Sequence, residues 1–317
     1  MRSRRCVGIL AGSATGKPAH GDRSAPCAWA RSKGIGLVRK LLLGIGAGAV
    51  VAAVGVGAWM LRPDPVVRSE AYAVPAPTAD QLAAVAETRF FFAHQSVGES
   101  LVAALPEVFE AGGVDAPPTV VLGDAVPEGS GVVIETMIGD NGDPIGKVAE
   151  FDRILRGGLA DQIDVALLKL CFVDIHADTD VEPVFEAYRD TLASLERDFP
   201  DITFMYSTVP LMHERDLFLR AKRLLGRGAE FDPIHNVTRE RLNALLRAEY
   251  GGTGRLFDPA KMEAAGTVGK VETLGSSEGE FLALRGGLAT DSGHLTPEGA
   301  VLIGGGLVAA LADAVTK

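Results

Sequence analysis

From Thr78 onward, the chain alternates between short apolar runs and longer segments in which apolar residues recur every three or four positions. The short runs predict strands and the longer segments predict helices. The predicted strands are 89–93, 119–122, 132–138, 164–171, 202–207 and 255–258. The predicted helices are 79–87, 97–111 with an interruption at Pro106, 144–155, 181–198, 236–250 and 297–315. This alternation predicts an α/β domain with one parallel sheet covered by helices.

Two regions of the chain lack this periodicity. Residues 62–85 begin with a stretch that contains four prolines, which predicts a semi-rigid linker before a domain at 86–317. Residues 259–290 contain many glycines and little periodicity. They predict a long loop or insertion near the functional site.

A long apolar segment precedes the linker. Residues 41–61 form a run of 21 residues without a charge, and a helix needs about 20 apolar residues to cross a bilayer core. Arg39 and Lys40 stand before the run, so the positive-inside rule predicts residues 1–40 in the cytoplasm and 62–317 outside. The sequence thus predicts a single-pass signal-anchor in the cell membrane. The alternative is a cleaved signal peptide, which gives the same topology without an anchor.

The N-terminal 40 residues show no apolar periodicity, and their Gly, Ala, Ser and Arg content predicts disorder. Their lack of a folding or targeting pattern also suggests that translation begins near Val38.

Charge and cysteine content exclude several function classes. Residues 1–61 hold nine of the 31 basic and one of the 41 acidic residues, which leaves 22 basic and 40 acidic in 62–317, a net charge of −18. A body this acidic argues against nucleic-acid binding. Cys171 is the only cysteine after the apolar run, so this part cannot form an internal disulfide or a thiolate zinc site. Residues 174–180 resemble a cation loop in composition but lack the glycine and glutamate of an EF-hand, so no metal is expected.

The first candidate for chemistry follows the first strand of the domain, in His94-Gln95-Ser96-Val97-Gly98. Ligands of open α/β sheets bind beyond the carboxyl ends of the strands. A serine at such a strand-to-helix turn has an exposed hydroxyl, next to backbone N–H groups that can stabilise an oxyanion. The alternative is that Ser96 only caps the helix. His94, close to Ser96 in the chain, is a candidate for lining the pocket.

The second candidate lies near the C-terminus, where Asp291 precedes His294 by three residues in a turn before the last helix. An aspartate in this position can orient the imidazole, which then accepts a serine proton as general base. The alternative is a surface histidine near a helix start.

A serine after the first strand together with a C-terminal Asp-x-x-His before the last helix resembles the SGNH (GDSL-like) hydrolase superfamily. The resemblance covers about residues 86–317 and implies a flavodoxin-like sheet, a catalytic triad of Ser96, Asp291 and His294, and no cofactor. His94-Gln95-Ser96 replaces the family's usual Gly-Asp-Ser. The family hydrolyses esters, often acyl or O-acetyl groups on carbohydrates or lipids.

The oxyanion hole departs from the family pattern. The family's second block supplies an oxyanion-hole glycine, and the segment 138–142 either provides it, with Gly139 as the first candidate, or is an ordinary turn. The third block, normally Gly-x-Asn-Asp, is replaced by Cys171-Phe172-Val173-Asp174. Val173 cannot donate a hydrogen bond from its side chain, so Asn141 is the candidate replacement donor. Together with the predicted topology, this indicates an extracytoplasmic serine esterase acting on envelope glycan or lipid esters. The alternatives are an acyltransferase with the same triad and a non-catalytic envelope binding protein.

Overall fold

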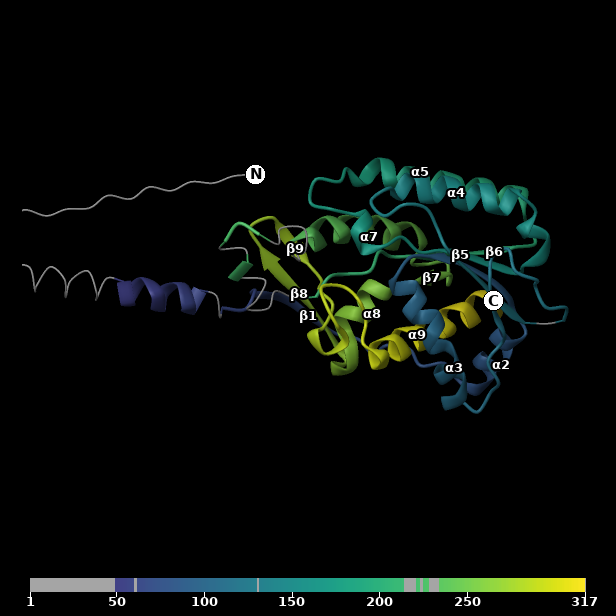
Figure 1. Cartoon of the computed structure of the whole chain (residues 1–317), viewed down its shortest axis with the longest axis horizontal. Coiled ribbons are helices and arrows are strands. Elements are labelled where there is room, and N and C mark those ends of the chain that lie inside the picture. The colour runs from purple at the N-terminus through teal and green to yellow at the C-terminus, as the bar shows by residue number, and fades with distance from the viewer. Residues whose placement is uncertain are drawn as a thin grey trace, which may run out of the picture. The chain divides into compact units, whose positions relative to one another are not determined.

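The computed structural model describes residues 49–59, 62–129, 131–213, 221–222, 225–227 and 234–316. The domain contains a six-stranded parallel sheet with the order β3-β4-β2-β5-β6-β7. Its strands β5, β6 and β7 are labelled in Figure 1. The strands are β2 (Arg89–His94), β3 (Thr119–Val121), β4 (Val132–Met137), β5 (Val165–Leu168), β6 (Thr203–Ser207) and β7 (Leu256–Phe257). Without the edge strand β3, the order in chain sequence is 2-1-3-4-5, which is the flavodoxin-like order. The α/β prediction is therefore confirmed.

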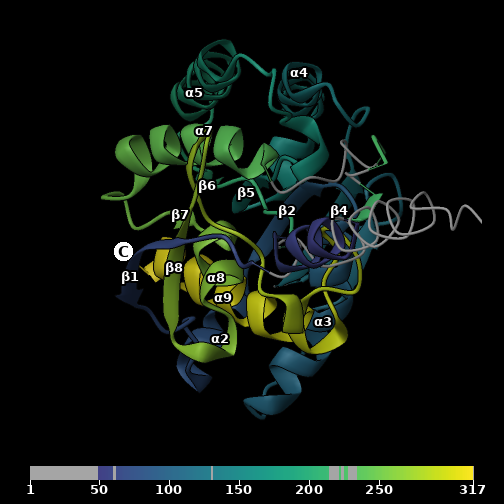
Figure 2. The ribbon, with the colours of Figure 1, turned by 90° about the vertical axis from the view of Figure 1, so that its left-hand side faces the viewer.

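Helices cover both faces of this sheet (Figure 2). One face is packed by α2 (Ala79–Ala86), α3 (Val97–Ala111) and α9 (Pro297–Thr316). The other is packed by α4 (Pro144–Arg156), α5 (Val181–Asp198) and α7 (His235–Tyr250). Strand side chains alternate between the two faces. In β2, accordingly, Phe90 and Phe92 belong to the first core and Phe91 and Ala93 to the second.

Local sequence explains most helix boundaries. Thr78 and Gln81 form a capping box at the start of α2. Asp143 caps α4, and Pro144 occupies its first turn, where a missing N–H costs nothing. Pro106 does not interrupt α3, which runs through it to Ala111, so the predicted break is wrong. The packing of α3 against the sheet and against its neighbour α9 holds the helix together there.

The two regions predicted as irregular contain regular elements. Strand β1 (Val66–Ala71) lies within the predicted linker and pairs antiparallel with β8 (Lys270–Ser276), which pairs with β9 (Gly279–Phe281). Helix α8 (Pro259–Ala265) also lies in the predicted loop. All six residues of β1 are exposed, so no alternation of burial marks the strand. Its hydrogen-bond partner lies about 200 residues further on, and local pattern could not reveal it.

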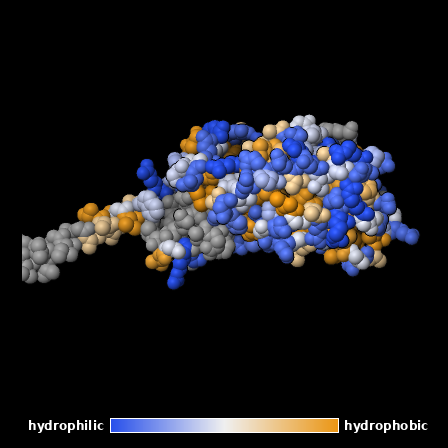
Figure 3. Space-filling view, turned by 90° about the horizontal axis from the view of Figure 1, so that it is seen from above, coloured by the Kyte–Doolittle hydropathy of each residue, from blue (hydrophilic) through white to orange (hydrophobic). Residues whose placement is uncertain are grey.

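Two apolar helices bear on the membrane prediction. Of the predicted span, the structure describes the helix Ala49–Trp59, and residues 1–48 and 60–61 lie outside the described residues. Its apolar side chains contrast with the largely hydrophilic face of the domain in Figure 3. Within the described chain, α9 alone is long and apolar enough to cross a membrane, but 67% of its most apolar window is buried. We therefore assign α9 to the domain core.

Charged side chains are also buried inside the domain. Glu263 on α8 is fully buried and accepts a hydrogen bond from the Leu211 N–H at 2.7 Å. Burial raises the pKa of Glu263 to about 8, although that bond and the nearby charges of Lys169 and Arg239 act in the opposite direction.

This buried carboxyl predicts a pH dependence of stability. Between pH 4.5 and about 8 the folded chain holds a proton on Glu263 that the unfolded chain has lost. The free energy of unfolding therefore falls as pH rises through this window, by at most about 1.4 kcal/mol per pH unit. Urea unfolding of the full chain at pH 5, 7 and 9 should show a weaker decline in Glu263→Gln than in wild type. The exposed control Glu107→Gln should follow wild type, and parallel curves for all three would contradict the assignment.

Candidate active site

Ser96 lies at the point where the strand order reverses, between β2 and β5. It follows β2 directly and is the N-terminal flanking residue of α3. Its φ of 20° is the only positive value at a non-glycine residue in the described chain. Such strain is found where the surrounding structure holds a functional side chain in place. The Ser96 side chain makes no capping hydrogen bond, so the helix-cap interpretation is wrong.

The turn around Ser96 is held by its neighbours. The Gly98 N–H donates to the Gln95 carbonyl at 2.8 Å. A Cβ on Gly98 would lie only 2.3 Å from the Cβ of His94, so only glycine fits there. The Gln95 amide donates to the carbonyls of Ile138 and Gly139 at 2.8 and 2.9 Å, which ties the turn to the loop after β4.

His94 does not line a pocket, because its side chain is fully buried. Its ring packs against Phe92 with centroids 4.7 Å apart, and its Nε2 lies 2.9 Å from Glu135 Oε2 without hydrogen-bond geometry. Burial, aided by the charge of Lys169, lowers the pKa of His94 to about 3. The imidazole is therefore neutral at ordinary pH and has a packing role beneath the turn.

Asp291 and His294 are paired in the turn before α9. His294 Nδ1 lies 2.7 Å from Asp291 Oδ2, and Asp291 Oδ1 accepts the N–H groups of Gly293 and His294, both at 2.9 Å. Burial raises the pKa of Asp291, but these three hydrogen bonds outweigh it and hold that pKa below its usual value. An ionised Asp291 places the proton on Nδ1 and leaves Nε2 as a proton acceptor.

Cys171 and Phe172, just after β5, lie beside both groups. The Sγ of Cys171 is 3.6 Å from the Ser96 Oγ. The Phe172 ring meets the His294 ring edge-on with centroids 5.6 Å apart, and Gly293 packs against the same ring. Among the described residues, no hydrogen bond joins Ser96 to His294 directly. In a structure without substrate such bonds are often long, and the shared neighbours bring the two groups to one edge of the sheet.

Both predicted oxyanion residues lie in the loop after β4. Gly139 has a φ of 57°, which a glycine adopts freely. Asn141 is exposed, and its Oδ1 accepts a hydrogen bond from Lys147 Nζ at 3.0 Å. Across the described ranges, no acceptor contacts the N–H groups of Ser96 and Gly139 or the Asn141 amide nitrogen. Within the described residues, these three donors therefore have no acceptor, whereas Val173 packs against the core.

Sequence reasoning missed the buried ion pair of Lys147 and Asp174, whose side chains are both 0% exposed. The one signal in the sequence is that Lys147 falls on the apolar side of its helix, with Val148 and Phe151. The expectation that residues 174–180 hold no metal stays a prediction. No group of metal-ligating side chains occurs there or elsewhere in the described chain.

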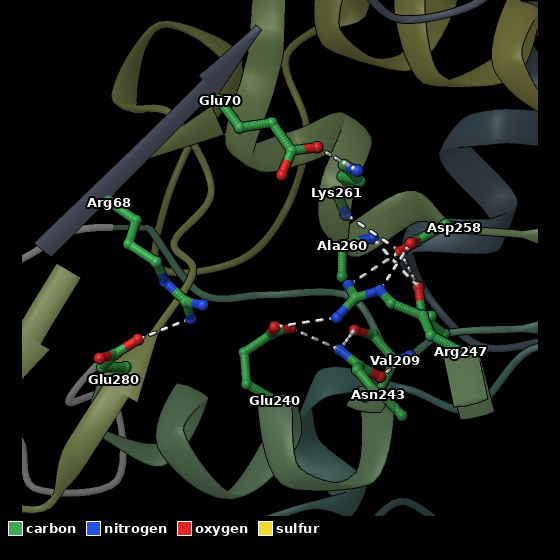
Figure 4. Close-up of polar contacts among 11 residues, drawn as sticks. Arg68, Glu70, Val209, Glu240, Asn243, Arg247, Asp258, Ala260, Lys261 and Glu280 are labelled. Carbon is green, nitrogen blue, oxygen red and sulfur yellow. Dashed lines mark hydrogen bonds and ion pairs between the residues drawn. The ribbon is translucent and has the colours of Figure 1, made fainter. Parts of the chain in front are cut away.

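A groove of about 830 Å³ lies away from these residues, between α7 and the sheet β1-β8-β9. Its charged side chains already have partners: Arg68 pairs with Glu280, Lys261 with Glu70, and Arg247 with both Glu240 and Asp258 (Figure 4). We therefore regard these charges as structural links between α7, α8 and the small sheet.

The fit of Gly98 against His94 generates a test of the turn. Gly98→Ala should lower the free energy of unfolding by about 1–3 kcal/mol, because the added methyl overlaps His94. Gly304→Ala on α9 is the matched control, since its Cβ would meet nothing closer than 3.6 Å. There the loss of glycine flexibility should stabilise the chain by about 0.5–1 kcal/mol. Thermal melts of the full chain measure the stability change of each variant. Equal changes in Gly98→Ala and Gly304→Ala would show that His94 moves away from the added methyl without loss of stability.

No family model matches the chain, and no curated protein matches it. Solved structures do match. A Streptococcus pneumonia protein provisionally described as a platelet activating factor is 13% identical, with a TM-score of 0.41 over 81% of this chain and 97% of its own. A Desulfitobacterium hafniense DCB-2 protein provisionally described as a lipolytic protein of the G-D-S-L family is 10% identical, with a TM-score of 0.39 over 70% of this chain and 99% of its own. At these values the two neighbours carry no argument about the function of this chain.

Proposed function

We propose that this chain is a serine hydrolase that acts on ester bonds, with Ser96 as nucleophile. The observation that carries the proposal is the Asp291–His294 pair, 2.7 Å apart, packed on Phe172 next to the cysteine that contacts Ser96. A serine, an ionised aspartate and a histidine whose second ring nitrogen has no partner among the described residues are the three groups that acyl transfer through a serine requires.

The reaction proceeds through an acyl-enzyme. Ser96 Oγ attacks the ester carbonyl while His294 Nε2 takes the hydroxyl proton, and Asp291 stabilises the imidazolium. The tetrahedral intermediate collapses as His294 returns the proton to the leaving alcohol, which leaves an acyl group on Ser96. Water then attacks the acyl-enzyme while His294 takes one of its protons. The second tetrahedral intermediate collapses as His294 gives that proton to Ser96 Oγ, and the carboxylic acid departs.

The oxyanion of each intermediate needs pre-oriented donors. The N–H groups of Ser96 and Gly139 and the amide of Asn141 have no other acceptor among the described residues, which supports assigning them this role. Asn141 thereby takes over the function that an asparagine in place of Val173 would have.

We further propose that the chain is anchored through residues 41–61, with the hydrolase domain outside the membrane. The charge-free run and the preceding Arg39 and Lys40 support this orientation. Acyl or O-acetyl esters of envelope glycans or lipids are then the accessible substrates, and a sugar hydroxyl replacing water would make the enzyme an acyltransferase.

A non-catalytic envelope binding protein is the second candidate. The observation that favours it is Val173, which provides no side-chain donor where the related enzymes have one.

A fluorophosphonate probe separates the two candidates. We expect covalent labelling of the full chain in detergent, none in Ser96→Ala, and labelling at least about 1,000-fold slower in His294→Ala, because the serine loses its base. Ser292→Ala, next to the pair, is the matched serine control and should label like wild type. Absence of labelling in wild type would favour the binding protein, and labelling of Ser96→Ala would place the nucleophile elsewhere.

The proposed orientation predicts protease accessibility. With a C-terminal tag, protease added outside intact membranes should digest residues 62–317. Protection until the membrane is broken would reverse the assigned topology. A tagged fragment that is soluble and lacks residues 1–61 would favour the cleaved signal peptide over the anchor.

A further inference from the structure

The buried ion pair of Lys147 and Asp174 connects the two loops on either side of Ser96. Lys147 belongs to the first turns of α4, directly after the loop that follows β4. Asp174 ends a short helical turn, η2 (Phe172–Asp174), in the loop that follows β5. Since β4 and β5 are the two neighbours of β2, the pair links the loops beside the nucleophile.

Each carboxylate oxygen of Asp174 accepts two hydrogen bonds. Oδ1 accepts from Lys147 Nζ at 2.7 Å and from the Gly142 N–H at 2.9 Å. Oδ2 accepts from Lys147 Nζ at 2.9 Å and from the Cys171 N–H at 2.7 Å. One buried carboxylate therefore fixes the backbone beside Asn141 and the backbone of the residue that contacts Ser96.

Lys147 also determines which way the Asn141 amide points. A lysine ammonium has only donors, so the Asn141 atom 3.0 Å from Nζ must be the carbonyl oxygen. The amide nitrogen is then directed away from Lys147, and no acceptor contacts it among the described residues. An exposed asparagine without this contact could turn its amide either way.

We propose that Lys147 and Asp174 are positioning residues that hold the Asn141 amide as the side-chain donor of the oxyanion hole. The inference rests on the proposed hydrolase function and deepens it. A buried ion pair is weak evidence for stability, because desolvation of both charges offsets their attraction, and it is retained more readily where it fixes a geometry. Here the pair fixes the orientation of the Asn141 amide. That amide replaces the side-chain donor that Val173 cannot provide.

The test is a mutant cycle on kcat and KM for p-nitrophenyl acetate, with the full chain in detergent. Asn141→Ala should lower kcat roughly 100-fold with little change in KM. The double variant Lys147→Met/Asp174→Asn removes both buried charges together and should lower kcat roughly 10- to 100-fold, again with little change in KM.

Coupling separates positioning from mere structural support. If the pair acts through Asn141, adding Asn141→Ala to the double variant should leave kcat within about 3-fold of Asn141→Ala alone, because the same donor is already lost. Losses that multiply would overturn the inference, as would an unchanged kcat in a folded double variant. If the double variant does not fold, Lys147→Gln/Asp174→Asn, which also leaves no buried charge unpaired, replaces it in the same cycle, with the same two outcomes.

Glu70→Gln/Lys261→Met is the matched control, because it removes an ion pair in the groove away from Ser96 (Figure 4). Its kcat should equal that of wild type, and a loss as large as that of the buried pair would overturn the inference. Failure of the hydrolase proposal itself is recognised separately, as absence of fluorophosphonate labelling in wild type. Labelling of wild type combined with a normal kcat in Asn141→Ala would leave the hydrolase standing and reject the positioning role.

Discussion

The pairing of β2 between β4 and β5 is the constraint on which the rest of this structure depends. Because β2 is central and parallel to both neighbours, its residues are buried on both faces, and its carboxyl end is flanked by two loops. Phe90 and Phe92 fill one core and Phe91 and Ala93 the other. The chain must then leave β2 sharply to start α3, and Ser96 occupies that turn with a strained φ of 20°. Strand order thus decides where the candidate chemistry lies.

Buried polar groups gather around this carboxyl end. Asp174 and Lys147 make five hydrogen bonds in the 2.7–3.0 Å range, to each other, to two backbone N–H groups and to the side-chain oxygen of Asn141. The pair joins the loops after β4 and β5, which lie on either side of the turn around Ser96. His94 and Glu263, in contrast, are kept neutral by burial over much of the ordinary pH range. Burying a charge without a partner is costly. Lys147 and Asp174 avoid this cost by pairing with each other, and His94 and Glu263 avoid it by staying neutral.

The proposed site differs at two places from the superfamily pattern that the sequence resembles. His94 and Gln95 stand where that pattern has Gly-Asp before the serine, and Val173 stands where it has an asparagine. Gln95 ties the turn around Ser96 to the loop after β4 through two carbonyls. The same loop carries Asn141, the donor that we assign in place of the missing one. The turn around Ser96 and the loop after β4 are therefore joined by Gln95, and the loop after β4 carries Asn141.

The sequence by itself determined the parallel α/β fold, with nearly all strands of the large sheet and the helices that cover it. It also provided Ser96, Asp291 and His294 as candidates for a catalytic triad. Strong apolar periodicity and short-range cap residues such as Thr78 and Asp143 act within a few residues, so they can be read locally. Only the tertiary structure decided that 66–71 is a strand and that His94 is buried. It also decided that Lys147 meets Asp174. Each of these depends on contacts between residues distant in the chain, and local pattern carries no information about such partners.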